Sequence, residues 1–395
     1  MARPLIVVGN PGNRRMTMLQ EARRRLGMSP AQIVPYLDLL QGRVRWREIT
    51  GGEPVLVRLD SPGEHFPVER ELIALGAADG GQADELFPLP EFLPMPVISA
   101  QAARNLPEQP GRIYYPSQWF RGFCRMLSGL RADLAETAPE ARWTNDPQEI
   151  AVMFDKRRCH RLLSSRGVPV PPAPGEAGSI RGYDQLREAM ERTGMRRVFV
   201  KLAFGSSASG ILAYQINPTT GAELADTTIG FERLGYERVY YNSRRLRRYR
   251  ERPIIREIIN WLGAQGMHVE QWVQKASHDG RAFDIRQLVV GGEACHRVAR
   301  LSRTPITNLH LRNERAGLEE LGLPAATVQA VAEAGEQVAS LFPRSAVAGI
   351  DVLLAKGALR PYIVDINPFG DLLLNVRYEG MDTYEWQMTR MLKDE

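Results

Sequence analysis

Residues 348–367 read AGIDVLLAKGALRPYIVDIN, two apolar stretches separated by a short turn. Alternate side chains of a strand share a face, so Asp365 and Asn367 point the same way. A turn centred on Ala358 places Asp351 directly opposite Asp365 on the partner strand. Two facing carboxylates repel each other unless a cation lies between them, and magnesium prefers hard oxygen ligands of this kind. The stretch therefore predicts a β-hairpin that carries a magnesium site.

A lysine on a strand precedes a flexible loop further upstream. The strand RVFVK ends at Lys201, and the loop FGSSASG follows it at residues 204–210. An ammonium can contact phosphate oxygens while the backbone of a glycine- and serine-rich loop approaches them closely. The pattern favours a triphosphate site, with Ser206 and Ser207 in its loop. It is not a Walker A loop, because no G-K-S or G-K-T sequence occurs.

The amino-acid composition makes the few lysines of the chain more informative about function. The chain has 395 residues, 44% of them hydrophobic and 25% charged, which is typical of a folded protein of two or three domains. Only five of its 51 basic residues are lysines, so arginine supplies most of the ordinary positive charge. A lysine is therefore expected more often where chemistry requires a compact ammonium. For Lys275, a surface position and a place beside a bound ribose both stay open.

The first segment alternates strands with helices. A helix with one apolar face is expected over residues 13–26, between short apolar stretches typical of buried strands. This alternation predicts a parallel, doubly wound sheet and an α/β class. Arg14 and Arg15, near the start of that helix, are expected to be solvated rather than bound to an anion. A second helix is expected around residues 147–166.

The net charge of +5 is concentrated in one segment. Residues 244–252, RRLRRYRER, hold six arginines and one glutamate, so the rest of the chain is balanced. That distribution argues against a broadly basic surface that binds nucleic acid. Two interpretations of Arg244–Arg252 stay open: a solvated surface, or an anchor for an acidic substrate or peptide.

Sequence features also bear on the compartment. No apolar run approaches the ~18 residues that span a membrane, and the apolar stretch at residues 5–9 is too short for a signal peptide. Cys124, Cys159 and Cys295 are widely spaced, which fits reduced thiols. We therefore expect a cytoplasmic protein with no membrane partner.

Taken in their order along the chain, the motifs over about residues 145–380 resemble those of the ATP-grasp superfamily. The resemblance implies three parts: a Rossmann-like domain that precedes the ATP-grasp lobes, an N-terminal lobe with a glycine-rich lid, and a C-terminal lobe with the metal site. The expected bounds of these parts are residues 1–145, 146–266 and 267–395.

The resemblance also assigns roles to single residues. DPQEIAVMFDK resembles the segment that carries the first nucleotide-binding lysine, here Lys156, and Lys201 corresponds to the second. HVEQWV is similar to the hinge strand, where Glu270 would meet the adenine amino group. Backbone atoms of the next three residues would complete adenine recognition; these are Gln271, Trp272 and Val273. The implied metal ligands are Asp351, Asp365 and Asn367.

One branch of the superfamily is most similar, the ribosomal-protein glutamate ligases, because FDIRQLVVGGEACHRVAR is followed by TNLH. The positions that match this branch are Arg286, Arg300 and Asn308, which would surround the transferring phosphoryl group and the acyl phosphate. A strict two-residue turn at Gly291 and Gly292 would put the two arginines on opposite faces. They converge only with a three-residue loop or a bulge, and we predict the loop.

The resemblance implies an ATP-dependent, ADP-forming carboxylate–amine ligase that acts through an acyl phosphate on a small molecule or a peptide. Its cofactors would be ATP and magnesium, with two ions expected and manganese as an alternative. Two other classes stay open: an ATP-grasp-type kinase that phosphorylates a hydroxyl of a small molecule, and a non-catalytic nucleotide-binding or scaffold protein. The intact lysine and metal positions favour an enzyme. The carboxylate, the amine and the oligomeric state stay open.

Overall fold

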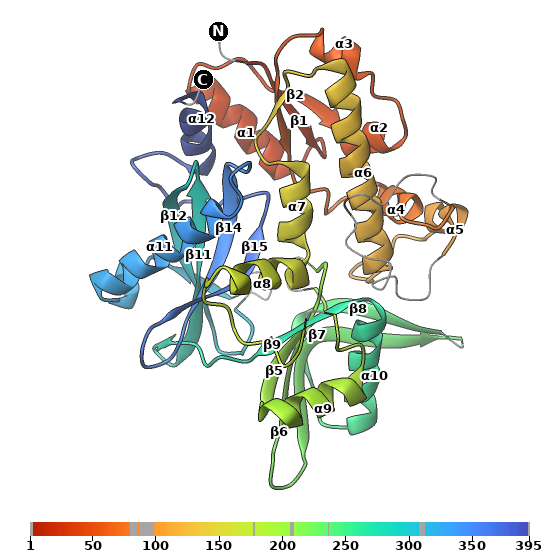
Figure 1. Cartoon of the computed structure of the whole chain (residues 1–395), viewed down its shortest axis with the longest axis vertical. Helices are drawn as coiled ribbons and strands as arrows, with labels where there is room; N and C mark the ends of the chain where they lie inside the picture. Colours follow the sequence, from red (N-terminus) through yellow and green to blue (C-terminus); the bar gives the residue numbers. More distant parts are fainter. Residues whose placement is uncertain are drawn as a thin grey trace.

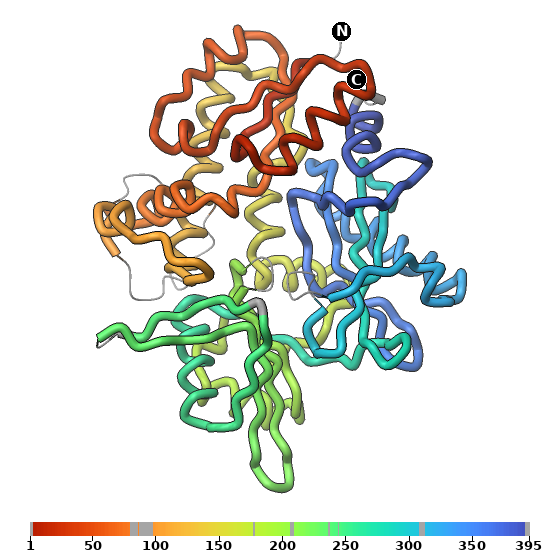
Figure 2. The backbone as a smooth tube through the Cα atoms, turned by 180° about the vertical axis from the view of Figure 1, so that it is seen from behind, coloured from red at the N-terminus to blue at the C-terminus, as the bar shows by residue number. Residues whose placement is uncertain are grey.

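The computed structural model describes residues 3–79, 86, 98–176, 178–205, 209–235, 237–307 and 313–393. Within these residues, three β-sheets follow one another along the chain, each covered by helices (Figure 1). Figure 2 shows the same arrangement from behind: the first and last parts lie side by side, and the middle part lies below them. No helix of the described residues is both long and apolar enough to cross a membrane.

The first sheet is parallel, with the strand order β2-β1-β3-β4. Its strands are β1 (Leu5–Gly9), β2 (Gln32–Pro35), β3 (Leu56–Leu59) and β4 (Arg142–Trp143). The helices along this part are α1 (Arg14–Arg25), α2 (Tyr36–Leu40), α3 (Trp46–Thr50), α4 (Phe66–Leu75), α5 (Ala100–Arg104) and α6 (Pro116–Thr137). The side chain of Asn13 caps α1 by accepting a hydrogen bond from Arg15 N at 2.9 Å.

Helices pack against both faces of this sheet, which confirms the doubly wound arrangement. On one face, Val7 shares a core with α1 and with Tyr384 of the C-terminal helix α12 (Thr383–Lys393). On the other face, Val8 packs in a core that contains Phe120 and Phe123 of α6. Neighbouring residues of β1 therefore serve opposite cores. The last helix of the chain thus covers the first sheet, and Figure 1 shows it beside α1.

Two helices, rather than the single one expected, lead to the second sheet. α7 (Pro147–Phe154) ends and α8 (Lys156–Ser165) begins at Asp155, which is fully buried. Its Oδ1 accepts a hydrogen bond from Arg157 N at 3.0 Å and so caps α8. The interruption makes Lys156 the first residue of a helix.

The second sheet is antiparallel, in the order β8-β7-β6-β5-β9. Its strands are β5 (Arg197–Leu202), β6 (Ile211–Ile216), β7 (Glu223–Leu234), β8 (Glu237–Tyr249) and β9 (Met267–Gln271). α9 (Tyr183–Thr193) and α10 (Arg252–Ala264) share a core with this sheet through apolar side chains such as Leu186 and Ile258. β9, just past the boundary expected at residue 266, pairs with β5 and so belongs to this sheet.

A short segment of the first part also joins this sheet. Ile113 N donates to Tyr240 O at 2.8 Å, and Asn242 N donates to Gly111 O at 2.7 Å. Residues 111–113 therefore lie alongside β8 and connect the first part to the middle one.

The third sheet is antiparallel, in the order β13-β12-β11-β14-β15, with β10 on β11. Its strands are β10 (Ser277–His278), β11 (Arg281–Val290), β12 (Glu293–Ser302), β13 (Glu314–Ala316), β14 (Val347–Leu354) and β15 (Pro361–Asn367). A short 3-10 helix, η3 (Glu319–Leu321), and α11 (Ala325–Ser340) share its core, in which Val331 and Val338 are fully buried. This sheet carries most of the charged residues considered below.

Candidate active site

The predicted hairpin is present, with the predicted register. Asp351 on β14 is paired with Asp365 on β15, and Gly349 with Asn367. Asp351 is nearly buried, whereas the side chain of Asp365 is 37% exposed. The described residues hold no group of three His, Cys, Asp or Glu side chains that could bind a metal alone. A metal at this hairpin would therefore have two carboxylates, an amide oxygen and ligands from a substrate.

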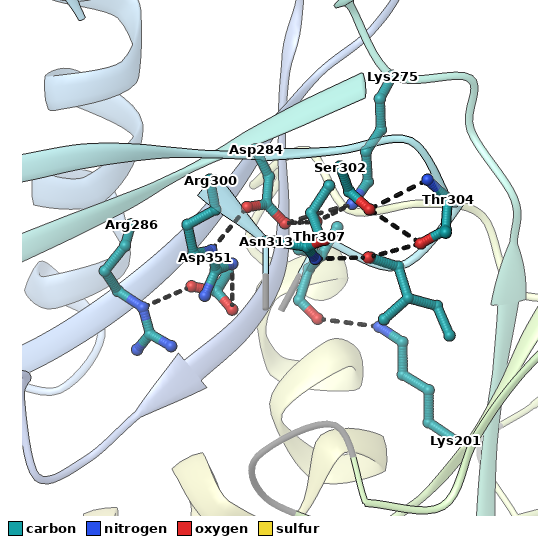
Figure 3. A network of polar contacts seen from close by, with 12 residues as sticks. Lys201, Lys275, Asp284, Arg286, Arg300, Ser302, Thr304, Thr307, Asn313 and Asp351 are labelled. Atoms are coloured by element: carbon teal, nitrogen blue, oxygen red, sulfur yellow. Dashed lines mark hydrogen bonds and ion pairs between the residues drawn. The ribbon is translucent and has the colours of Figure 1, made fainter. Parts of the chain in front are cut away.

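Two arginines converge on one of these carboxylates (Figure 3). Arg286 Nε lies 2.7 Å from Asp351 Oδ1, and Arg300 Nη2 lies 2.9 Å from Oδ2. The three-residue loop predicted between β11 and β12 is wrong, because Val290 pairs directly with Glu293 across a two-residue turn.

A bulge brings the two arginines to the same face instead. Gln287 pairs with Arg297, but Val289 pairs with Ala294, so β12 has one more residue than β11 over this interval. The shift sets Arg300 opposite Asp284, two residues from Arg286 on the same strand. The bulge, and not the turn, keeps Arg300 at this site.

Sequence reasoning missed Asp284, which lies at the centre of a buried network. Its Oδ1 lies 2.7 Å from Arg300 Nε, and its Oδ2 contacts the hydroxyl of Thr307 and lies 3.3 Å from Lys275 Nζ (Figure 3). Burial alone would raise the pKa of Asp284, but Arg300 and Lys275 hold it at about 2. Strand periodicity could have identified Asp284, because it shares a face with Arg286.

The same network shows whether Lys275 lies on the surface. Its side chain is 9% exposed and contacts Thr307, so it is not a surface lysine. Burial lowers its pKa, although the carboxylate of Asp284 opposes that shift. Lys275 is a buried partner of Asp284.

The second expected phosphate lysine pairs with the expected hinge glutamate. Lys201 Nζ lies 2.5 Å from Glu270 Oε1 and donates to Val364 O at 3.2 Å, across the two sheets. His268 Nε2 lies 3.1 Å from the other oxygen of Glu270. Burial would raise the pKa of Glu270, but Lys201 and His268 hold it at about 2. Burial lowers the pKa of His268, so this imidazole is neutral at pH 7.

The first expected phosphate lysine pairs with an expected metal ligand. Lys156 Nζ lies 2.7 Å from Asp365 Oδ1 and joins α8 to β15. A cavity of about 20 Å³ is lined by Lys156, Glu270 and Asp365 together with neighbouring apolar side chains. This volume holds no more than a water molecule, so α8, β9 and β15 pack closely around this ion pair.

The backbone N–H groups at the end of the expected hinge strand, β9, and of the two residues after it donate within the protein. Gln271 N donates to Pro172 O at 2.7 Å, Trp272 N to Arg197 O at 3.1 Å, and Val273 N to Gln271 O at 3.0 Å. An adenine at this strand would therefore meet carbonyl oxygens, which accept from its amino group. The Trp272 ring packs 5.4 Å from the ring of Phe199.

Three of the expected residues, Ser206, Ser207 and Asn308, lie outside the described residues. The arginine segment 244–252 runs from the end of β8 into α10. Two of its members pair with acids of β7: Arg248 Nε lies 2.7 Å from Asp226 Oδ1, and Arg252 Nε lies 2.9 Å from Glu223 Oε1. The sheet therefore neutralises part of the charge of this segment.

Arg15 differs from expectation, because it is not solvated. Its side chain is 15% exposed, its Nε lies 2.6 Å from Asp60 Oδ1, and its Nη2 donates to Phe369 O at 2.5 Å. The carboxyl end of the first sheet thus touches the segment that follows the β14–β15 hairpin. Asp371, in that segment, lies 3.6 Å from Arg286.

Comparisons with known proteins agree on the fold. No family model matches the sequence, and a search of curated proteins gives no match either. The structure is similar to D-cycloserine synthetase DcsG at 14% sequence identity, over 98% of this chain and 99% of that one, with a TM-score of 0.52. It is also similar to the Campylobacter jejuni biotin carboxylase complex with βγ-ATP, at 12% identity over 98% of this chain and 70% of that one, with a TM-score of 0.53. A complex of the ATP-grasp ligase PsnB with precursor peptide PsnA2 and AMPPNP matches at 13% identity over 100% and 98% of the two chains, with a TM-score of 0.49.

Proposed function

Because this chain has the ATP-grasp fold, we propose that it is an ATP-dependent, ADP-forming carboxylate–amine ligase that acts through an acyl phosphate. The first sheet would hold part of the substrate, the middle lobe would cover the nucleotide, and the third sheet would carry the metal and the reacting groups. We propose the boundaries of these parts near residue 145 and, because β9 pairs with β5, just after residue 271, with β9 as the hinge strand.

One observation carries the proposal. The expected phosphate lysines, metal carboxylates and phosphoryl arginines, which come from four separate segments of the chain, meet at one place. The pairs are Lys156 with Asp365, Lys201 with Glu270, and both Arg286 and Arg300 with Asp351. Each group of the proposed reaction therefore lies beside a group of opposite charge.

The residues present fit magnesium. Asp351 and Asp365 face each other across the hairpin, and Asn367 lies on the same strand as Asp365. Two carboxylates and one amide oxygen are too few for six ligands, which suits an ion that keeps waters and binds phosphates. When bound, the metal would supply neutralisation of the β- and γ-phosphate charge.

The protein's own groups would then position the triphosphate and the carboxylate. Lys156 and Lys201 bind phosphate oxygens, and Glu270 accepts a hydrogen bond from the adenine amino group. Arg286 and Arg300 offset the negative charge that develops as the substrate carboxylate attacks the γ-phosphorus. An amine then displaces phosphate from the acyl phosphate. Neither step needs a covalent bond to the protein, so catalysis rests on positioning and electrostatics.

Binding of ATP and metal would exchange the partners of these charged side chains. Lys156 would release Asp365 for the metal, Lys201 would release Glu270 for adenine, and the arginines would release Asp351. Each buried charge therefore keeps a partner before and after binding, which avoids the cost of an unpaired buried charge.

Two measurements test the function. Calorimetric titration of AMPPNP with Mg²⁺ should show binding, and its absence would rule out the enzyme. ADP release should then be screened over a panel of carboxylic acids in the presence of hydroxylamine, which traps an acyl phosphate as a hydroxamate. We expect a carboxylate that gives ADP and hydroxamate in equal amounts. ADP release with a small-molecule alcohol and no amine would indicate a kinase instead.

A further inference from the structure

Arg300 is held by two carboxylates that come from different strands. Its Nε donates a hydrogen bond to Asp284 Oδ1 at 2.7 Å, and its Nη2 lies 2.9 Å from Asp351 Oδ2 (Figure 3). Asp284 lies opposite Arg300 on β11, whereas Asp351 lies on β14. Of these two acids, only Asp351 is an expected metal ligand. Asp284 is therefore the carboxylate that would stay with Arg300 when a metal binds at the hairpin.

The carboxylate of Asp284 is held firmly in place. β11 is paired with β12 on one side and with β14 on the other, which fixes the backbone of Asp284. Its Oδ2 accepts hydrogen bonds from the Thr307 hydroxyl and from Lys275 Nζ, the second at 3.3 Å. The residue is 3% exposed, and Figure 3 shows its carboxylate between Arg300 and Lys275. These contacts do not involve Asp351, so they can persist whether or not Asp351 binds a metal.

Arg286 has no comparable anchor. Its Nε lies 2.7 Å from Asp351 Oδ1, but neither atom has a hydrogen-bond partner among the residues that the structure describes, so this contact is one of charge alone. Its Nη1 donates to Gly349 O at 3.4 Å, and Asp371 lies 3.6 Å from its Nε. If the metal takes Asp351, Arg286 is left with these longer contacts, whereas Arg300 keeps a short hydrogen bond between two charged groups.

We propose that Asp284 is a positioning residue for Arg300 and that it acts on phosphoryl transfer only through that guanidinium. The inference rests on the ligase function proposed above. Because Asp284 holds Nε, the plane of the guanidinium is fixed, and Nη2 stays beside the hairpin where it can meet the transferring phosphoryl group. An arginine oriented in advance does not have to be ordered during the transfer itself.

The test uses the carboxylate that gives ADP and hydroxamate in the screen described above. Asp284→Asn should lower kcat for ADP release by about tenfold to a hundredfold, because Arg300 loses its charged anchor. The KM for ATP and the affinity for AMPPNP with Mg²⁺ should stay within about twofold, since Asp284 contacts neither the nucleotide nor the metal. A general loss of structure would change kcat, KM and affinity together, and that result would overturn the inference.

The matched control is Asp226→Asn. Asp226 is another nearly buried acid whose Oδ1 lies 2.7 Å from an arginine Nε, here that of Arg248, but it lies in the middle sheet. The control removes the same kind of pair and should leave kcat unchanged. An equal fall in kcat in Asp226→Asn would overturn the inference, because the loss of any buried pair would then be sufficient.

A double-mutant cycle shows whether Asp284 acts through Arg300. In protein that carries Arg300→Gln, Asp284→Asn should lower kcat by less than about threefold more, because the group that it positions is absent. In protein that carries Arg286→Gln, the same substitution should lower kcat by its full factor. Equal losses in the two cases would overturn the inference and indicate that Asp284 affects the site as a whole.

Thr307→Val provides a milder change if Asp284→Asn does not fold. It removes one hydrogen-bond donor to Asp284 Oδ2 and should lower kcat by about threefold to tenfold, but not in protein that carries Arg300→Gln. Unchanged kcat in Asp284→Asn, or in Thr307→Val where Asp284→Asn does not fold, would overturn the inference and leave the ligase intact. Failure of the unaltered protein to bind AMPPNP with Mg²⁺, or to form hydroxamate with any carboxylate, would remove the ligase function and the inference together.

Discussion

Lys156 and Asp365 are ion-paired at 2.7 Å, although Lys156 begins α8 and Asp365 lies on β15, 209 residues later. The pair joins a proposed phosphate ligand to a proposed metal ligand. Neither ligand can bind fully until the pair separates, so phosphate and metal are expected to depend on each other.

The first prediction is that nucleotide and magnesium bind synergistically. Metal alone must compete with Lys156 for Asp365, and nucleotide alone must leave Asp365 unpaired. We expect AMPPNP to bind about tenfold or more tightly in Mg²⁺ than in EDTA, a coupling of about 1.4 kcal/mol. Calorimetry in the two buffers measures this difference, and equal affinities would contradict the proposed metal ligands.

A second prediction concerns Asp365 itself. Asp365→Ala should lower turnover by about two to three orders of magnitude or more, because one of two metal carboxylates is lost. The side chain is 37% exposed, so the free energy of unfolding should change little. ADP release measures the activity, and denaturant unfolding measures the stability. Full activity in this variant would show that the metal lies elsewhere.

A third prediction follows from the buried pair of Lys201 and Glu270. Glu270→Gln leaves a buried ammonium without its partner and should reduce the free energy of unfolding by about 3–5 kcal/mol at pH 7. The pKa of Glu270 is about 2 in the folded protein against an ordinary value of 4.5. Ionised Glu270 therefore stabilises the fold above about pH 4.5, and this stabilisation is lost as the pH falls toward 2.

Urea unfolding at pH 7, 5 and 3 should accordingly show a difference between Glu270→Gln and the unaltered protein that shrinks at the lowest pH. A difference that stays constant between pH 7 and pH 3 would mean that the charge of Glu270 is not the stabilising feature.

A fourth prediction tests the contact between α4 and α6. A Cβ atom at Gly122 would lie 1.8 Å from the backbone oxygen of Leu72, so the two helices approach closely only because the side chain is absent. Gly122→Ala should reduce the free energy of unfolding by about 1–3 kcal/mol. Gly63→Ala is the control, because its Cβ would have Ser61 Oγ at 3.6 Å as its nearest neighbour and no clash.

A structural feature could be predicted from the sequence where it depends on only one or two neighbouring elements. The facing positions of Asp351 and Asp365 were predicted from strand periodicity and a turn centred on Ala358. The structure has them paired, with a bulge between Asp351 and Val352 that the sequence did not indicate. Asp284 could have been found by the same periodicity. The break between α7 and α8 was missed because residues 147–166 contain no glycine and no proline after Pro147, although an aspartate such as Asp155 often caps a helix.

Features that depend on register or on distant segments were not predictable. Convergence of Arg286 and Arg300 needs the bulge in β12, and no residue of that strand marks it. Arg15 reaches Phe369, 354 residues away in the chain, so its burial depends on how the first and third parts pack. A local pattern contains no information about such packing.

The placement of α12 governs which part of the molecule can move. Because this last helix packs on the first sheet, the first and third parts are held together as one frame. Motion between the parts is therefore expected as a swing of the middle lobe against this frame. That swing meets a restraint, because residues 111–113 of the frame are hydrogen-bonded to Tyr240 and Asn242 of β8. These two hydrogen bonds restrain that movement. Substitutions that weaken them should therefore alter the rate at which nucleotide enters.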